Sequence, residues 1–560
     1  MAVGLLSLPI ELICHILLIL TPGDLCHCIT TCKIVWDAAQ NSVHIQYKLE
    51  LYAQGFNETG ATTPDSIGVS TKMCSLKRLG SSWRSDFHTN TVFEDRVVCS
   101  DELQLQGIQS AKCGIWWMAR WEREWEQANL RVLIRECKAN TTHSNITLRG
   151  LVSQHHHWRP RSIVIDPLQN LVVAISSAAR IDMPNTELAL HAFTVDVWLA
   201  SSQLPHPDSA RTSFECMHTC DAYSSYSVYF VGMPAVCGDH VVILYYVVNL
   251  DFRVDGTDAA SNMFIQVIAW RKGHIKRYPL CERGGQGVTF HLVDERTVVV
   301  VSEGRMTVYT LQGPGDSIQR RIAYLLPNLK PGFGPSRRAS PYYVAYATPS
   351  FHSAVAHPGL MPSYVPSPES QIMVLEILPR SWPVIMVIDM AVFSEKAARS
   401  ENPVEVPWAD WGPKYTWCFP HHPSHRISVF GSKMAYALPR DRTPEPGQRV
   451  EALSSDHFYV HIWDFNKRFI ARSQNTHDPD SPDVVICKPG RFPQSCFDED
   501  LTSNHPYTAS VCPEPFSMHR FDRFFLEQDR LTLIWLSAIV VDIRVISPVP
   551  MEVLLDPEMH

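Results

Sequence analysis

The chain has few charged side chains for its length, and this scarcity excludes several kinds of partner. Aspartate, glutamate, lysine and arginine make up 19% of the 560 residues, the net charge is −8 and the pI is near 6.3. General affinity for nucleic acid or for an anionic membrane requires clustered lysine and arginine. We therefore expect neither nucleic acid nor a membrane as a partner.

Apolar runs long enough to cross a bilayer are also lacking near the N-terminus. The run from Ile10 to Leu20 is too short and carries Glu11 and His15, and no basic start or small-residue cleavage site accompanies it. The sixteen cysteines are sparse for a disulfide scaffold of this length. We expect reduced thiols, Cys26, Cys28 and Cys32 included, in a protein of the cytoplasm or nucleus.

Motifs for catalysis and for metal binding are missing as well. The sequence contains no HExxH, no GxSxG and no Walker-type loop, and the glycine-rich stretch 284–287 precedes an expected strand instead of a helix. Neighbouring histidines on an extended chain point to opposite faces, so we interpret 155–157 and the group His421, His422 and His425 as solvated loops. We expect no enzyme, no catalytic residue, no cofactor and no metal.

The first fifty or so residues carry a series of helix boundaries. Pro9 suits a first helical turn, and Thr21, Pro22 and Asp24 form a capping signal that also ends the preceding helix. Gly55 suits a helix terminator. We predict four helices: 10–20, one beginning at residue 22, 33–39 and 42–53.

The first of these helices is apolar on nearly all sides. Ile10, Ile13, Leu17 and Leu20 line one face, while Leu12, Ile16 and Ile19 line another. A helix of this kind must be buried nearly all round, and a module of about fifty residues is too small to cover both faces. One face therefore needs a partner.

The residue pattern of this segment resembles the F-box motif, and most of all the F-box proteins of basidiomycete fungi. The positions that carry the resemblance are Leu8-Pro9-x-Glu11-Leu12, Ile16, Leu20, Pro22-x-Asp24-Leu25, Cys28, Cys32-Lys33 and Trp36. The resemblance implies docking onto a Skp-type linker that joins the protein to a cullin–RING ubiquitin ligase. It implies a contact face made of Leu8, Pro9, Leu12, Ile16, Leu20 and Leu25. From the residues alone, core and interface stay equally open for any single one of them.

The rest of the chain divides into a connecting segment and a long region of strands. A stretch rich in glycine, serine, threonine and proline leads to one predicted helix with Leu76, Leu79 and Trp83, which resembles the helix after the F-box in these fungal proteins. From about residue 91, short alternating apolar runs end in turn residues, as is typical of an all-β domain. The expected domains are 1–56, 57–90 and 91–560.

The strands recur in a pattern that resembles degenerate WD-type blades. Trp270 and the pair Trp463-Asp464 stand where such blades carry their terminal Trp-Asp, although the Gly-His pair is missing. We expect a small all-α module followed by a large all-β domain, an irregular β-propeller of six to eight blades; another multi-sheet all-β architecture is the alternative.

The segment 115–137 has a different character. It carries four tryptophans among alternating charges. We predict an amphipathic helix or an edge insertion packed on the β domain, because Glu122, Glu124 and Glu126 remove the positive field that nucleobase stacking needs.

Together these features favour an adaptor that recruits a protein substrate to the ligase and positions it for ubiquitination. The sequence does not identify that substrate. Two alternatives remain: a β-propeller hydrolase whose N-terminus merely resembles an F-box, and an F-box scaffold that works without the ligase.

Overall fold

The computed structural model describes twenty-two stretches of the chain. They are 5–59, 68–83, 87, 90–98, 108–123, 128–137, 160–183, 186–202, 204–251, 261–283, 287–311, 318–330, 342–351, 362–378, 383–393, 404–439, 452–453, 456–475, 486–487, 490–492, 496–537 and 539–548. The histidine run 155–157 and most of the glycine-rich stretch 284–287 lie outside them.

The N-terminal part is helical, as the boundary residues predict. It contains η1 (Leu5–Ser7), α1 (Ile10–Ile19), α2 (Pro22–Ile29), α3 (Lys33–Asn41), α4 (Val43–Gln54) and α5 (Val69–Ser82). The Thr21 hydroxyl accepts a hydrogen bond from the Asp24 amide at 3.2 Å and so caps α2. Gly55 ends α4 with φ 75°, the left-handed conformation that favours glycine. All four predicted helices are confirmed within one or two residues.

These helices belong to two separate cores. Ile13 and Leu17 of α1 pack with Leu25, Val35 and Ile45 in a small cluster made by α1 to α4 alone. The opposite side of α4 joins α5 and the sheets in a second cluster, to which the helical part of the chain contributes Tyr47, Leu76 and Trp83. Helix α4 is therefore shared between the helical module and the β domain.

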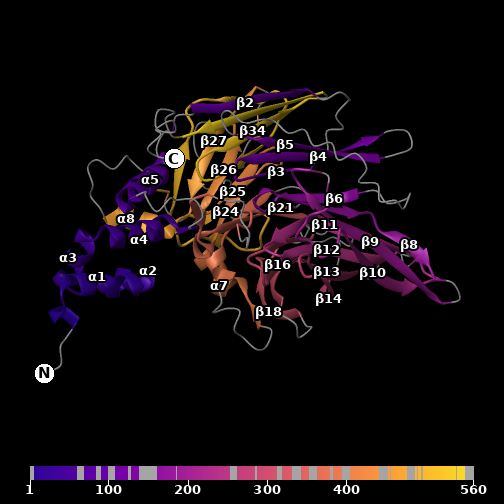
Figure 1. Ribbon diagram of the computed structural model, residues 1–560, viewed down its shortest axis with the longest axis horizontal. Helices are drawn as coiled ribbons and strands as arrows, with labels where there is room; N and C mark the ends of the chain where they lie inside the picture. The colour runs from indigo at the N-terminus through magenta and orange to yellow at the C-terminus, as the bar shows by residue number, and fades with distance from the viewer. Residues whose placement is uncertain are drawn as a thin grey trace.

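The rest of the described chain is mainly antiparallel β-sheet (Figure 1). The first three large sheets, each in its order of pairing, are β33 (Phe521–Leu526), β34 (Leu531–Leu536), β35 (Val540–Ser547) and β2 (Asn90–Val98); β3 (Ile108–Lys112), β4 (Ile115–Arg123) and β5 (Ala128–Glu136); and β6 (Pro160–Asp166), β7 (Leu171–Ser176), β9 (Leu188–Leu199) and β10 (Ser213–Asp221), with β8 (Ala179–Asp182) also beside β9.

Four further large sheets follow along the chain. They are β11 (Tyr226–Cys237), β12 (His240–Asn249), β13 (Ser261–Ala269) and β14 (His274–Arg283); β15 (Thr289–Leu292), β16 (Thr297–Ser302), β17 (Arg305–Leu311), β18 (Ile318–Leu325) and β23 (Val404–Val406); β19 (Tyr342–Ala347), β21 (Ile372–Leu378), β22 (Val384–Asp389) and β24 (Thr416–Pro420); and β25 (Ile427–Phe430), β26 (Lys433–Leu438), β27 (His457–Asp464), β31 (Tyr507–Val511) and β28 (Ile486–Cys487), with β32 (Phe516–Ser517) beside β27.

Short elements connect these sheets. Two small sheets pair β1 (Phe56–Glu58) with β20 (Tyr364–Pro366) and β29 (Arg491–Phe492) with β30 (Leu501–Thr502). Helices α7 (Trp408–Tyr415) and α8 (Lys467–Asn475) and the turns η2 (Pro167–Gln169), η4 (Pro368–Ser370) and η5 (Met390–Phe393) complete the described elements. The expectation of a small helical module followed by a large all-β domain is confirmed.

The first strand of each large sheet lies against the first strand of the next. Contacts run from β3 to β6, β11, β15, β19, β25 and β33 in chain order. The side chains of Gln109 in β3 and Asp522 in β33 are hydrogen bonded, so the sheet of β33 also meets the sheet of β3. Strand β2 pairs with β35 along its whole length, which ties residues 90–98 to residues 540–547.

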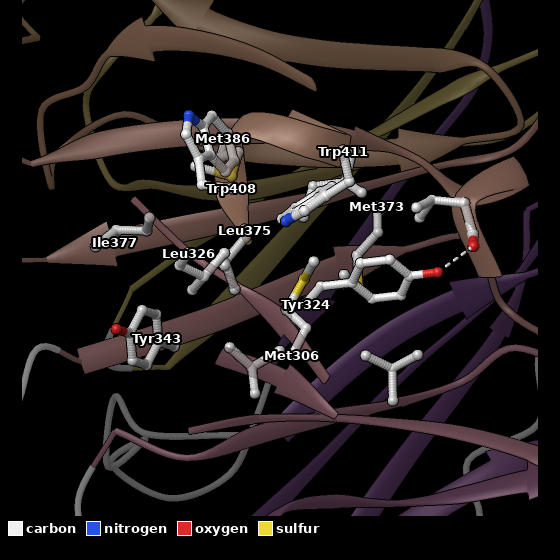
Figure 2. Packing of buried hydrophobic residues seen from close by; sticks show 14 of the residues in the cluster. Met306, Tyr324, Leu326, Tyr343, Met373, Leu375, Ile377, Met386, Trp408 and Trp411 are labelled. Carbon is white, nitrogen blue, oxygen red and sulfur yellow. Dashed lines mark hydrogen bonds between the residues drawn. The ribbon is translucent and has the colours of Figure 1, made fainter. Parts of the chain in front are cut away.

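Apolar side chains fill the spaces between consecutive sheets. Figure 2 shows one such cluster, in which Met306, Met373 and Met386 from three strands surround Tyr324 and the indoles of α7. The Tyr324 hydroxyl donates to the Val392 carbonyl at 2.8 Å, so burial leaves no polar atom of this side chain unpaired.

Of the two forms predicted for residues 115–137, an amphipathic helix or an edge insertion on the β domain, the helix is wrong. Strands β4 and β5 pair antiparallel here, with Ile115 opposite Glu136; Glu124 and Glu126 lie outside the described residues. Trp116 and Trp117 are both buried, yet they belong to clusters on opposite sides of the sheet. Successive strand residues alternate between faces, and here both faces are covered, so the tryptophans are core.

Candidate protein-binding surface

Exposed apolar side chains gather on the helical module. Of the eighteen large hydrophobic side chains exposed in the described chain, eight lie between residues 6 and 43. They are Leu6, Ile10, Leu12, Ile16, Ile19, Ile34, Trp36 and Val43. The surface of a globular protein normally scatters such residues singly, so their concentration on one small module makes it a candidate interaction site.

Helix α1 supplies the densest part of this surface. Leu12, Ile16 and Ile19 follow one another at helical spacing and are 48%, 37% and 83% exposed. Ile13 and Leu17 point the other way, into the small core. Covering the three exposed side chains would contribute roughly 2–5 kcal/mol before the costs of association. We call this row the α1 face.

The structure separates the six residues of the predicted contact face into three groups. Leu12, Ile16 and Pro9 are exposed, and Leu8 and Leu20 are half-buried. Leu25 has no exposed surface and lies in the small core, so its assignment to the contact face is wrong. The reason is that α2 turns Leu25 inward against α3 and α4, which the spacing of the motif does not reveal.

Six of the eight exposed apolar residues lie outside the predicted contact face: Leu6, Ile10, Ile19, Ile34, Trp36 and Val43. Ile19 lies seven positions after Leu12, which is the helical repeat that returns a side chain to the same face. Ile34 and Trp36 flank the buried Val35 in α3, and only the packing of α3 shows which of the three is core.

Helix α8, inserted between β27 and β31, fixes the helical module to the β domain. The Arg468 guanidinium lies 3.8 Å from the centre of the Tyr52 ring and donates to the Ser370 hydroxyl at 3.1 Å and the Glu369 carboxylate at 3.0 Å. The Asn466 amide donates to the Ala53 carbonyl at 2.9 Å. A side chain at Gly55 would meet Ser370 at 2.6 Å, so glycine is needed there for close approach as well as for its φ.

A buried carboxylate strengthens the same contact. Glu50 of α4 accepts from the amide of Gln54 at 2.7 Å and from Arg472 of α8 at 2.7 Å. Burial would raise the pKa of Glu50, but these two partners outweigh it and lower the pKa. The ion pair therefore holds α4 on α8. We call the set Arg468, Arg472, Glu50, Tyr52 and Asn466 the α4–α8 clamp.

The histidine group at 421–425 is not a solvated loop, and that prediction is wrong for two of its members. His421 and His425 are 5% and 4% exposed. The Tyr436 hydroxyl lies 2.9 Å from Nδ1 of His421 and 3.1 Å from Nδ1 of His425. Nε2 of His421 lies 2.8 Å from the Glu376 carboxylate. The four side chains join two neighbouring sheets, and their polar groups serve as hydrogen-bond partners for one another.

The residue types of this buried network are common in active sites, but the side chains are not accessible to a substrate. Tyr436 is fully buried and Glu376 is 7% exposed, so no substrate reaches them in this conformation. Within the described ranges, no group of three histidine, cysteine or acidic side chains has the arrangement of a metal site. The fifteen described cysteines are reduced and form no disulfide with one another. Burial raises the pKa of the Cys216 thiol to about 12, which disfavours the reactive thiolate.

Comparisons with known proteins add little. No family model and no curated protein matches the chain. A crystal structure of a functionally unknown protein from Desulfotomaculum acetoxidans is similar over 67% of this chain and 87% of that one, at 12% identity and a TM-score of 0.25. The AfRom2 CNH domain is similar over 83% of this chain and 98% of its own, at 8% identity and a TM-score of 0.25. TM-scores this low carry no argument about fold or function. Among the described helices, none has the length and apolar character needed to cross a membrane.

Proposed function

We propose that the protein is a substrate-recruiting adaptor that docks through its helical module onto a Skp-type linker of a cullin–RING ubiquitin ligase, in the cytoplasm or nucleus. The α1 face carries the proposal, because three large apolar side chains stand exposed on a module whose own core is already filled. The F-box resemblance assigns Leu12 and Ile16 to the contact face, and it assigns Leu8, Pro9 and Leu20 there as well, each of which keeps some accessible surface.

We further propose that the β domain is an irregular propeller of seven blades that presents the target. Three observations support it: the contacts between first strands in chain order, the hydrogen bond between Gln109 and Asp522, and the pairing of β2 with β35. Trp270 directly follows β13, the third strand of its sheet, and Trp463 lies in β27, the third strand of another; both are buried. These are the places that a WD-type blade gives to its tryptophan.

The α4–α8 clamp supports positioning as the mechanism. An adaptor accelerates transfer by raising the local concentration of the target's lysines near the ubiquitin carrier. A firm junction between docking module and target platform limits the orientations in which the target is held. The protein's own residues perform no bond chemistry in this proposal.

Co-purification with a Skp-type linker tests the docking step. The full chain should retain the linker, and the pair Leu12→Asp and Ile16→Asp should lose it, because each carboxylate would be buried without a partner at the interface. The matched control is Val404→Asp, at a side chain that is 42% exposed on β23. If wild type fails to bind, or if the α1 variant binds as well as wild type, the docking proposal is wrong.

Two further measurements separate the alternatives. A ligase-independent scaffold would bind the linker but would not bring a cullin with it, so cullin in the same complex favours the adaptor. A hydrolase would turn over a substrate as the isolated chain, without linker or cullin, and would keep that activity in the Leu12→Asp and Ile16→Asp variant. Ubiquitination of a bound target that depends on Leu12 and Ile16 is the result expected from the adaptor.

A further inference from the structure

A second group of exposed apolar side chains lies at the far end of the molecule from α1, where β8, β9 and β10 meet (Figure 1). Ile181, Leu188 and Met217 are 42%, 45% and 50% exposed. Ile181 pairs with Leu190, and Met217 pairs with Ala192. Cross-strand partners and alternate residues share a face of a sheet, so the three exposed side chains lie on one face. We call it the outer face.

Neighbouring sheets pack against the rest of this sheet on both of its sides. On the side of the outer face, Val172 and Ala174 pack against Trp117 and Val132 of the neighbouring β3–β5 sheet. On the opposite side, Phe193 and Phe214 pack against the β11–β14 sheet. The outer face is the part that continues beyond the neighbouring sheet, where β8 replaces β7 beside β9.

Two acidic residues of β10 belong to the outer face. Glu215 and Asp221 are exposed in β10 on the same side as Met217. Between residues 179 and 224 the sequence has six carboxylates and two arginines, a net charge of −4 within a chain whose total is −8. One of the arginines, Arg180, belongs to the other face and is held there by the carbonyls of Ala222 and Ser224.

We propose that the outer face binds a segment of a partner protein in which apolar side chains alternate with lysine or arginine. The apolar residues would cover Ile181, Leu188 and Met217, and the cations would meet the carboxylates of Glu215 and Asp221. Methionine suits such a surface because its unbranched chain adapts to different partners. The negative charge disfavours a nucleic acid or an anionic membrane as the occupant. The proposal rests on the proposed adaptor function in one respect: it takes the partner protein to be the target that the adaptor recruits.

Fluorescence anisotropy with labelled peptides tests the binding. The probes are three synthetic peptides of equal length, composed of leucine and lysine, of leucine and glutamate, and of glycine and lysine. The full chain should bind the leucine–lysine peptide at least about tenfold more tightly than either other peptide, because only this one satisfies both the apolar and the acidic groups.

Variants locate the site. Leu188→Lys combined with Met217→Lys should weaken binding of the leucine–lysine peptide about tenfold or more. Glu215→Lys changes only the charge; it should weaken binding about threefold and flatten its dependence on salt. Ile539→Lys, at a side chain that is 48% exposed in the turn before β35, is the matched control and should leave binding unchanged. Circular dichroism of each variant checks that it has folded.

Three outcomes would overturn the proposal. The first is equal affinity for the leucine–glutamate peptide, and the second is wild-type affinity in both the double variant and Glu215→Lys. The third is a dimer of the wild-type chain, in sedimentation equilibrium, that dissociates in the double variant, since that assigns the outer face to a second copy. Peptide binding should persist in the Leu12→Asp and Ile16→Asp variant, and linker binding should persist in the Leu188→Lys and Met217→Lys variant. Failure of one proposal is thereby distinguishable from failure of the other.

Discussion

Removing one arginine from the α4–α8 clamp should loosen the junction between the helical module and the β domain without unfolding either part. In the variant Arg468→Ala, α4 loses the cation–π contact with Tyr52, and α8 loses its bonds to Ser370 and Glu369. The arginine side chain is 23% exposed, so its ring contact contributes about 1 kcal/mol and the polar contacts together about 1 kcal/mol. The free energy of local opening should fall by about 2 kcal/mol.

Hydrogen exchange followed by mass spectrometry measures that change directly. A loss of about 2 kcal/mol corresponds to roughly thirtyfold faster exchange of the α4 amides. Strands of the β11–β14 sheet should exchange at the wild-type rate. The control is Arg96→Ala, which removes an ion pair with Asp542 whose two side chains are 69% and 44% exposed. That variant should change exchange by less than about twofold. Wild-type exchange of α4 in Arg468→Ala would refute the clamp.

Three further predictions concern stability. Tyr436→Phe removes the hydroxyl that His421 and His425 share, so it should lower the free energy of unfolding, measured by urea titration, by about 2–4 kcal/mol. The control Tyr223→Phe, at a side chain that is 79% exposed, should have no effect. Burial raises the pKa of Tyr324 and Tyr343 to about 12, and the pKa of Tyr436 well above its ordinary value. The unfolded chain releases these protons near pH 10 while the folded chain holds them, so the urea midpoint should fall as the pH rises above 10. The share of the tyrosinate absorbance that belongs to these buried tyrosines should appear only on unfolding. Burial lowers the pKa of His291 to about 4, and burial together with Arg277 does the same for His218. The unfolded chain binds these protons near pH 6.5, so stability should fall between pH 6.5 and pH 4, and the fall should be smaller in His218→Gln if that chain folds.

Local signals in the sequence predicted the elements, whereas contacts between distant segments decided which side chains are buried. Thr21 and Gly55 mark helix ends through their own hydroxyl and backbone, so the helices could be read from the sequence. The F-box resemblance assigns Leu25 to the contact face and leaves out Ile19. Only the packing of α2 against α3 and α4 buries the first and leaves the second exposed.

The two wrong predictions in the β domain have the same physical origin. Charges alternating around Trp116 and Trp117 imitate an amphipathic helix, because nothing local reveals that sheets cover both faces of this strand pair. His421 and His425 are polar neighbours in a connection between strands, which is typical of a solvated loop. Their partners Tyr436 and Glu376 come from other strands, and these hydrogen bonds make burial of the imidazoles tolerable.

The pairing of β2 with β35 also has a consequence for synthesis of the protein. Residues 90–98 leave the ribosome long before residues 540–547 exist, so the sheet that contains β2 cannot be completed until nearly the whole β domain has been translated. During that interval β2 exposes an unpaired strand edge, the feature through which nascent chains aggregate or engage chaperones. A chain that stops before β35 would keep that edge exposed permanently, and cellular quality control would then remove it.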